Sequence, residues 1–191
     1  MSDAQRALPL AVAAPLAAVF AAVLALAAWW GLRPATPEGG PAGGDATVVR
    51  VVDGDTIVVD IGGGEQPVRL IGIDTPESVA RDRPVECFGA EASDRLAALL
   101  PPGTGVRLTR DVEPRDVYDR LLAYVHRTTD GLFVNAAQVA DGFAEAKDYP
   151  PNTTYRDDFE HAERVARQAG LGLWSACGSP DVALAPASQA P

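Results

Sequence analysis

The stretch Arg69-Leu70-Ile71-Gly72-Ile73-Asp74-Thr75-Pro76-Glu77 contains the most informative pattern in this chain. It begins with an arginine, continues with mostly aliphatic residues, and ends with two carboxylates on either side of Thr75-Pro76. Aliphatic residues at this density favour burial, whereas paired carboxylates require water, a cation or an arginine. The pattern therefore predicts a buried strand that runs into a turn able to bind a hard divalent cation.

The residues around this stretch predict further strands. Apolar, β-branched runs at 47–52 and 56–61 flank the turn Asp53-Gly54-Asp55, and glycines precede a third strand over 67–73. Additional strands are expected at 106–108 and 118–126. Five strands with helices inserted and appended indicate a mainly β domain of the α+β class, in which helices cap a small closed barrel.

Three helices are predicted between and after these strands. The spacing of apolar residues indicates a helix over 88–100, which Pro101-Pro102-Gly103 ends. Asn135 is expected to cap the N-terminus of a second, short helix, with Gln138 as its capping-box partner. A last helix is expected over 154–169.

Residues 1–33 are predicted to form an N-terminal signal anchor, that is, a transmembrane helix. Residues 7–32 contain no charge, and as a helix they would span about 39 Å, more than the roughly 30 Å hydrocarbon core of a bilayer. The alternative is a signal peptide cleaved near Ala25-Leu26-Ala27. We therefore expect a single-pass protein of the cell membrane with its domain outside the cytoplasm, or a secreted protein if the segment is cleaved.

One domain is predicted between two flexible segments. Residues 34–46 are rich in proline and glycine and indicate a linker, and residues 178–191 resemble a disordered tail. The domain at 47–177 contains Cys87 and Cys177. In an exported domain two cysteines most simply form one disulfide, which would contribute about 4 kcal/mol to stability by closing a long loop. Two separate buried thiols are the alternative.

The charge of the chain disfavours unaided binding to nucleic acid. The net charge is −10 and Lys147 is the single lysine, whereas nucleic-acid binding normally depends on a basic surface. His126 and His161 show no spacing typical of a zinc site. A polyanionic substrate would therefore depend on local positive charge.

Two groups of polar side chains are candidates for chemistry. Asp53, Asp55, Asp74 and Glu77 come from two turns of one meander. Such turns can meet at one end of a barrel, where the carboxylates would bind a hard cation such as calcium; a solvated hairpin turn is the alternative for Asp53-Gly54-Asp55. Arg69 and Arg120 can grip phosphate oxygens in a bidentate manner, and structural salt bridges are the alternative.

Tyrosines form a third candidate group. Their rings can stack on nucleic-acid bases, although half-buried packing positions are the alternative. The candidates are Tyr118, Tyr149 and Tyr155.

Three motifs occur together, in order and with appropriate spacing. They are Asp53-Gly54-Asp55-Thr56, the stretch from Arg69 to Glu77, and Tyr118-Asp119-Arg120-Leu121-Leu122-Ala123-Tyr124-Val125. Over roughly residues 46–176 the chain resembles the staphylococcal nuclease (thermonuclease) family. The resemblance implies a five-stranded OB-fold barrel with three helices. It also implies a calcium-dependent nuclease that hydrolyses DNA and RNA with low sequence specificity and leaves 3′-phosphates.

The resemblance also implies metal and catalytic roles for individual residues. Asp55 and Asp74 would bind calcium through their carboxylates, and Thr75 would bind it through its carbonyl oxygen. Glu77 would activate or orient the attacking water. Arg69 and Arg120 would clamp the scissile phosphate and stabilise the transition state.

Two departures from the family pattern concern the substrate. The glycine that the family usually places before the second arginine is Asp119 here; this carboxylate could pair with Arg120 and withdraw it from phosphate, or it could point to solvent. One family tyrosine aligns near Lys147, whereas Tyr149 matches the other; Tyr118 and Tyr149 are therefore the expected substrate contacts. We expect a monomer. The alternative function is a non-catalytic OB-fold module that binds nucleic acid or a partner at the cell surface.

Overall fold

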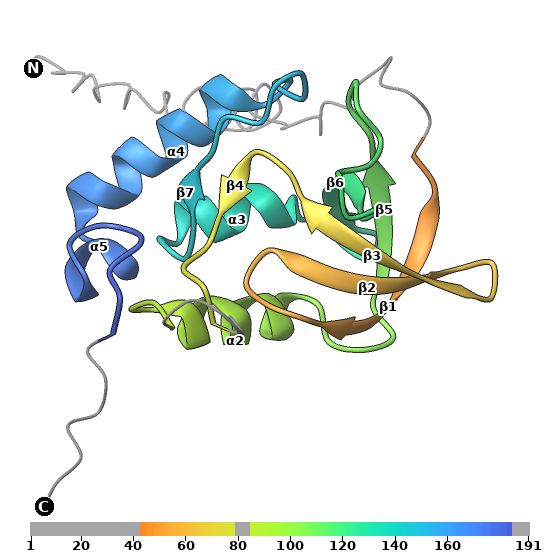
Figure 1. Cartoon of the computed structure of the whole chain (residues 1–191), viewed down its shortest axis with the longest axis horizontal. Coiled ribbons are helices and arrows are strands. Elements are labelled where there is room, and N and C mark those ends of the chain that lie inside the picture. Colours follow the sequence, from red (N-terminus) through yellow and green to blue (C-terminus); the bar gives the residue numbers. More distant parts are fainter. Residues whose placement is uncertain (1–42, 79–84, 185–191) are drawn as a thin grey trace, which may run out of the picture. The chain divides into compact units, whose positions relative to one another are not determined.

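The computed structural model describes residues 43–78 and 85–184. The predicted signal anchor therefore lies outside the described residues, and within them no helix is both long and apolar enough to cross a bilayer. The elements, labelled as in Figure 1, are β1 (Asp45–Val51), β2 (Thr56–Ile61), β3 (Gly64–Leu70), β4 (Ile73–Asp74), α2 (Gly89–Leu99), β5 (Gly105–Thr109), β6 (Leu121–Arg127), α3 (Val134–Ala140), β7 (Glu145–Ala146), α4 (Arg156–Ala169) and α5 (Leu173–Ala176).

Five strands close into a barrel in the order β1-β2-β3-β6-β5. All neighbouring pairs are antiparallel except β3 and β6, which run parallel. The barrel interior is filled by buried aliphatic side chains, among them Val48, Ile57, Val59, Val68, Leu70, Val106 and Val125. The predicted α+β class and five-stranded barrel are confirmed, and the barrel fits the OB-fold that the resemblance implies. The short helix α5 was not predicted.

The third predicted strand is interrupted, so the expectation of one strand over 67–73 is wrong. β3 ends at Leu70, and Gly72 adopts a φ of +80°, which turns the chain away from the barrel. A Cβ at Gly72 would lie 2.4 Å from a ring carbon of Phe159, so glycine is required there for space as well as for conformation. The next two residues form β4, which pairs with β7 instead. This turn directs Asp74 out of the barrel wall.

Two polar residues of α3 do not cap the helix. Asn135, predicted as the N-cap, is buried inside α3, where its side chain accepts a hydrogen bond from the Val125 amide (2.9 Å) and donates one to the Ile71 carbonyl (2.9 Å). Gln138 donates to the carbonyl of Gly54 at 2.8 Å. The capping prediction is wrong because buried main-chain groups of the barrel bind these amides more favourably than the helix end does.

The predicted disulfide between Cys87 and Cys177 is confirmed, and it closes a loop with a sequence separation of 90. Beyond it, the first part of the segment that was expected to be disordered makes main-chain hydrogen bonds. The Cys87 amide donates to the Val182 carbonyl (2.7 Å), and the Leu184 amide donates to the Val85 carbonyl (2.9 Å). Residues 85–87 are therefore connected to the C-terminal segment both covalently and by hydrogen bonds.

Asp111 joins the barrel to the segment before α4. Its Oδ2 accepts hydrogen bonds from the Tyr124 hydroxyl (2.8 Å) and the Thr154 amide (3.0 Å). Burial alone would raise the pKa of Asp111, but these hydrogen bonds lower it overall. The ionised carboxylate therefore stabilises the folded state.

Replacing Asp111 by asparagine is expected to lower the free energy of unfolding by about 1–3 kcal/mol at pH 7, since the buried Tyr124 hydroxyl and the Thr154 amide lose a charged acceptor. The pKa of Asp111 is lower in the folded state than in the unfolded state. Its contribution to stability is therefore complete above the unfolded-state pKa of about 3.9 and is lost as the pH falls through the folded-state pKa. Urea unfolding between pH 7 and pH 3 measures this difference, with exposed Asp94→Asn as the control. If the difference in unfolding free energy between the unmodified chain and Asp111→Asn does not become smaller toward pH 3, the role assigned to the Asp111 carboxylate is contradicted.

Candidate active site

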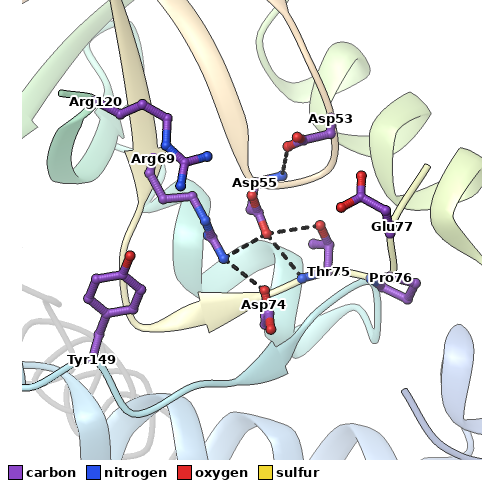
Figure 2. A pocket seen from close by; sticks show the side chains of 9 residues that line it. All are labelled: Asp53, Asp55, Arg69, Asp74, Thr75, Pro76, Glu77, Arg120 and Tyr149. Atoms are coloured by element: carbon purple, nitrogen blue, oxygen red, sulfur yellow. Dashed lines mark hydrogen bonds and ion pairs between the residues drawn. The ribbon is translucent and has the colours of Figure 1, made fainter. Parts of the chain in front are cut away.

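Four segments meet around an open cavity of about 270 Å³. They are the β1–β2 turn, the end of β3 with β4 and the residues that follow it, the turn before β6, and the loop after β7. The lining residues, shown in Figure 2, are Asp53, Asp55, Arg69, Asp74, Thr75, Pro76, Glu77, Arg120 and Tyr149. The structure therefore brings together every predicted metal and catalytic residue, and one of the two predicted substrate tyrosines.

The Asp53-Gly54-Asp55 turn lies directly against the end of β4. A Cβ at Gly54 would be 2.7 Å from the Thr75 hydroxyl oxygen and 2.9 Å from the Ala92 Cβ, so only glycine permits this approach. Asp53 stabilises the turn, since its Oδ1 accepts a hydrogen bond from the Asp55 amide (3.1 Å). Close packing of the two turns explains how carboxylates far apart in sequence reach one cavity.

Asp55 is the buried carboxylate of the site. Its Oδ2 accepts hydrogen bonds from the amide and the hydroxyl of Thr75, each at 3.1 Å, and lies 2.9 Å from Nη2 of Arg69. Burial raises the pKa of Asp55 to about 7; Arg69 opposes this shift, whereas Asp53 and Asp74 add to it. Four carboxylates but only two guanidinium groups line the cavity, and this balance of charge favours an additional cation.

Arg69 bridges the two predicted metal ligands. Its Nη2 lies 2.9 Å from Asp55 and donates a 2.8 Å hydrogen bond to Asp74. Its Nη1 donates to the carbonyls of Leu70 (2.6 Å) and Ile73 (3.0 Å), which the break between β3 and β4 exposes. Figure 2 shows the guanidinium between these carboxylates. Arg69 therefore fixes the carboxylates of Asp55 and Asp74 relative to each other.

The donor atoms of the cavity fit a hard divalent cation. Within residues 43–78 and 85–184, no three His, Cys, Asp or Glu side chains converge closely enough to hold a metal by themselves. Asp55 and Asp74 offer carboxylate oxygens, and Thr75 offers a main-chain carbonyl, which are the ligand types that calcium accepts together with water. A cation bound here would thus rely on two carboxylates, one carbonyl and solvent.

The main chain at Glu77 is held by Glu86. The Glu77 amide donates to Oε2 of Glu86 (2.7 Å), and the Glu86 amide donates to the Glu77 carbonyl (2.9 Å). In Figure 2, Glu77 and Arg120 lie on opposite sides of the Asp55–Arg69 pair. A substrate group in the cavity would therefore have a carboxylate on one side and a guanidinium on the other.

Arg120 is held by Asp116 and not by Asp119. Its Nε donates to Oδ2 of Asp116 at 2.6 Å, while Oδ1 of Asp116 accepts the amides of Tyr118 and Arg120, each at 2.9 Å. Burial raises the pKa of Asp116, but its bonds to Arg120 lower it overall. Because this pair uses only Nε, the two Nη groups of Arg120 stay available to a ligand in the cavity.

Asp119 adopts a φ of +63°, and its carboxylate lies 3.3 Å from Arg115. This left-handed conformation explains why glycine suits the position, and aspartate is among the residues that tolerate it. The possibility that Asp119 withdraws Arg120 from phosphate is therefore contradicted by the observed pairing.

The three candidate tyrosines occupy different environments. Tyr149 lines the cavity, whereas Tyr118 does not line it and is 76% exposed, with its ring centroid 5.5 Å from Cζ of Arg120. Tyr155 packs edge-on against Tyr124, with ring centroids 4.6 Å apart, and also against Phe133. Tyr155 therefore occupies the half-buried packing position that is the alternative to base stacking.

Two contacts at the site were not predicted from the sequence, that of Asp116 with Arg120 and that of Lys147 with Asp74. Asp116 could have been found from its spacing of four from Arg120, a distance at which opposite charges can meet across a turn. Lys147, whose Nζ lies 3.2 Å from Oδ2 of Asp74, gives no such local signal. Its contact depends on the pairing of β4 with β7.

Several known proteins are similar in sequence to this domain. The family model described as staphylococcal nuclease homologue matches residues 67–176, which include Arg69, Asp74, Glu77 and Arg120. The thermonuclease of Staphylococcus intermedius is 45% identical over 127 residues, covering 66% of this chain and 74% of the relative. That of Staphylococcus hyicus is 41% identical over 128 residues, covering 67% and 74%. Endonuclease YncB of Bacillus subtilis (strain 168) is 38% identical over 136 residues, covering 70% and 63%.

Proposed function

The chain belongs to the staphylococcal nuclease family of nuclease-type hydrolases, and we propose that it hydrolyses phosphodiester bonds of DNA and RNA in a calcium-dependent reaction. The proposed reaction has low sequence specificity and leaves 3′-phosphates. The observation that supports it most directly is the meeting of Glu77, Arg120 and the Asp55–Arg69–Asp74 cluster in one cavity. Such an arrangement combines a proton acceptor, a phosphate ligand and a cation site.

The proposed roles follow from the chemistry of each group. Glu77 orients the attacking water and accepts its proton. Arg120 donates from its Nη groups to the phosphate oxygens, with a strength that grows as their negative charge increases. Asp55, Asp74 and the Thr75 carbonyl would hold calcium, which when bound supplies electrostatic stabilisation of the phosphate. Arg69 keeps the two carboxylates in position.

The acidity of the chain supports the calcium requirement. With a net charge of −10, the protein repels a polyanion at long range. Local positive charge at the cavity must therefore overcome this repulsion. We propose that chelation of calcium weakens substrate binding as well as abolishing the reaction.

The proposed location is outside the cytoplasm, either at the cell membrane or as a secreted protein, with the domain acting as a monomer. The disulfide between Cys87 and Cys177 supports this location, because such bonds persist mainly in oxidising compartments.

The test is a cleavage assay on the full chain with its disulfide intact. DNA and RNA are incubated with the protein in calcium or in chelator, and the fragment ends are identified by enzymatic end-labelling. We expect cleavage of both polymers in calcium alone, with 3′-phosphate and 5′-hydroxyl ends. If both polymers remain intact in calcium but bind the protein, the non-catalytic module is the correct interpretation.

A further inference from the structure

Both carboxylate oxygens of Asp74 are ion-paired, each with a different cation. Oδ1 accepts from Nη2 of Arg69 at 2.8 Å, and Oδ2 lies 3.2 Å from Nζ of Lys147. Asp74 is one of the two carboxylates placed to hold the proposed calcium. A divalent cation that binds Asp74 must therefore compete with one of these two side chains.

The two competing cations differ in how firmly they are held. The side chain of Arg69 is 8% exposed, and two main-chain carbonyls fix its other nitrogen. The side chain of Lys147 is 48% exposed, and within the described residues its ammonium pairs only with Asp74 and, at 3.7 Å, with Glu145. A lysine ammonium on a flexible stem rearranges far more readily than a buried, multiply bonded guanidinium. Lys147 is therefore the side chain that leaves.

The main chain of Lys147 stays in place when its ammonium moves. Its amide donates to the Gly72 carbonyl (3.0 Å), and the preceding residues pair with β4. Tyr149, two positions along the chain, lines the cavity. The released ammonium can then pair with Glu145, at 3.7 Å, or with a phosphate of a nucleic acid bound in the neighbouring cavity, and Asp181 is a further anion that acts on it.

We propose that Lys147 is a substrate-positioning residue that pairs with Asp74 in the cation-free protein and binds a substrate phosphate once a divalent cation occupies Asp74. The inference rests on the proposed function. It gives Lys147 two opposite effects: the side chain weakens cation binding in the absence of nucleic acid and strengthens nucleic-acid binding in the presence of the cation. A residue with a merely structural role would not produce this reversal.

The first experiment measures calcium binding to the full chain by titration calorimetry, without nucleic acid. Lys147→Met is expected to bind calcium about three- to fivefold more tightly, since a partly exposed ion pair no longer competes. Lys147→Arg keeps the charge and is expected to stay within about twofold of the unmodified chain. Arg156→Met is the matched control, because Arg156 is a nearby cation that pairs with Asp148 and not with Asp74. Unchanged calcium affinity in Lys147→Met overturns the inference.

The second experiment measures binding of a single-stranded oligonucleotide in saturating calcium over a series of salt concentrations. A Glu77→Gln background slows cleavage, so that binding is measured before the strand is cut. Adding Lys147→Met is expected to reduce the slope of log affinity against log salt by about 0.7, the value for one phosphate contact on a single strand. An unchanged slope overturns the inference.

The outcomes separate this inference from the proposed function. If the unmodified chain binds no calcium, both fail. If it binds calcium and cleaves nucleic acid but Lys147→Met changes neither affinity nor slope, only the role of Lys147 fails. Equal thermal midpoints for all variants exclude loss of folding as the cause.

Discussion

Replacing Glu77 by glutamine is expected to lower kcat by about 10²–10⁴-fold, which is the usual contribution of a positioned general base. Glutamine preserves the size of the side chain but cannot accept a proton from water. Its main chain should stay in place, because Glu86 binds the Glu77 amide and carbonyl regardless of the side chain. The loss should therefore appear in kcat, with KM almost unchanged.

Single-turnover cleavage of DNA in saturating calcium measures this effect without interference from product release. Glu91→Gln is the matched control, since Glu91 is an exposed glutamate at the start of α2, and its rate should stay within about twofold. Retention of more than a tenth of the rate by Glu77→Gln would show that another group activates the water.

Replacing Arg120 by alanine is expected to lower the rate by about 10²–10³-fold, as for the removal of one transition-state donor elsewhere. Arg120→Lys should restore only part of this loss, because an ammonium cannot donate two parallel hydrogen bonds. The measurement is the same single-turnover assay, with calcium affinity followed in parallel. Calcium affinity should not change, since Asp116 and not a proposed metal ligand holds Arg120.

Asp119→Gly provides a sharp control for this interpretation. The substitution removes the neighbouring carboxylate and restores a residue that favours a φ of +63°. Because Asp119 pairs with Arg115 and not with Arg120, the rate should stay within about twofold. A tenfold or larger increase would mean that Asp119 does withdraw Arg120 from the phosphate in solution.

Local sequence patterns predicted the elements whose stability is local. An apolar, β-branched run correctly indicated β2, alternation correctly indicated β5, and helical spacing correctly indicated α2. The carboxylates of the Asp53-Gly54-Asp55 turn and of Asp74 were expected to meet, because consecutive strands of a meander place their turns close together. This expectation agrees with the cavity.

The errors occurred where a distant residue decides the local structure. The strand breaks at Gly72, against which Phe159 of α4 packs, and no pattern within 67–73 contains that contact. Asn135 has the sequence environment of a helix cap, yet its amide binds the Ile71 carbonyl across the core. Choosing between Asp116 and Asp119 as the partner of Arg120 required the backbone conformation of the turn, which composition does not specify.

The disulfide determines the order in which the candidate site is completed. Cys177 follows all barrel strands and α2, α3 and α4 in the chain, so its bond to Cys87 can form only after those elements have been synthesised. Cys87 adjoins Glu86, which holds the main chain of the proposed catalytic base. Oxidation takes seconds to hours, far longer than the formation of individual helices and hairpins. Covalent anchoring beside Glu77 is therefore a late event in the maturation of this hydrolase.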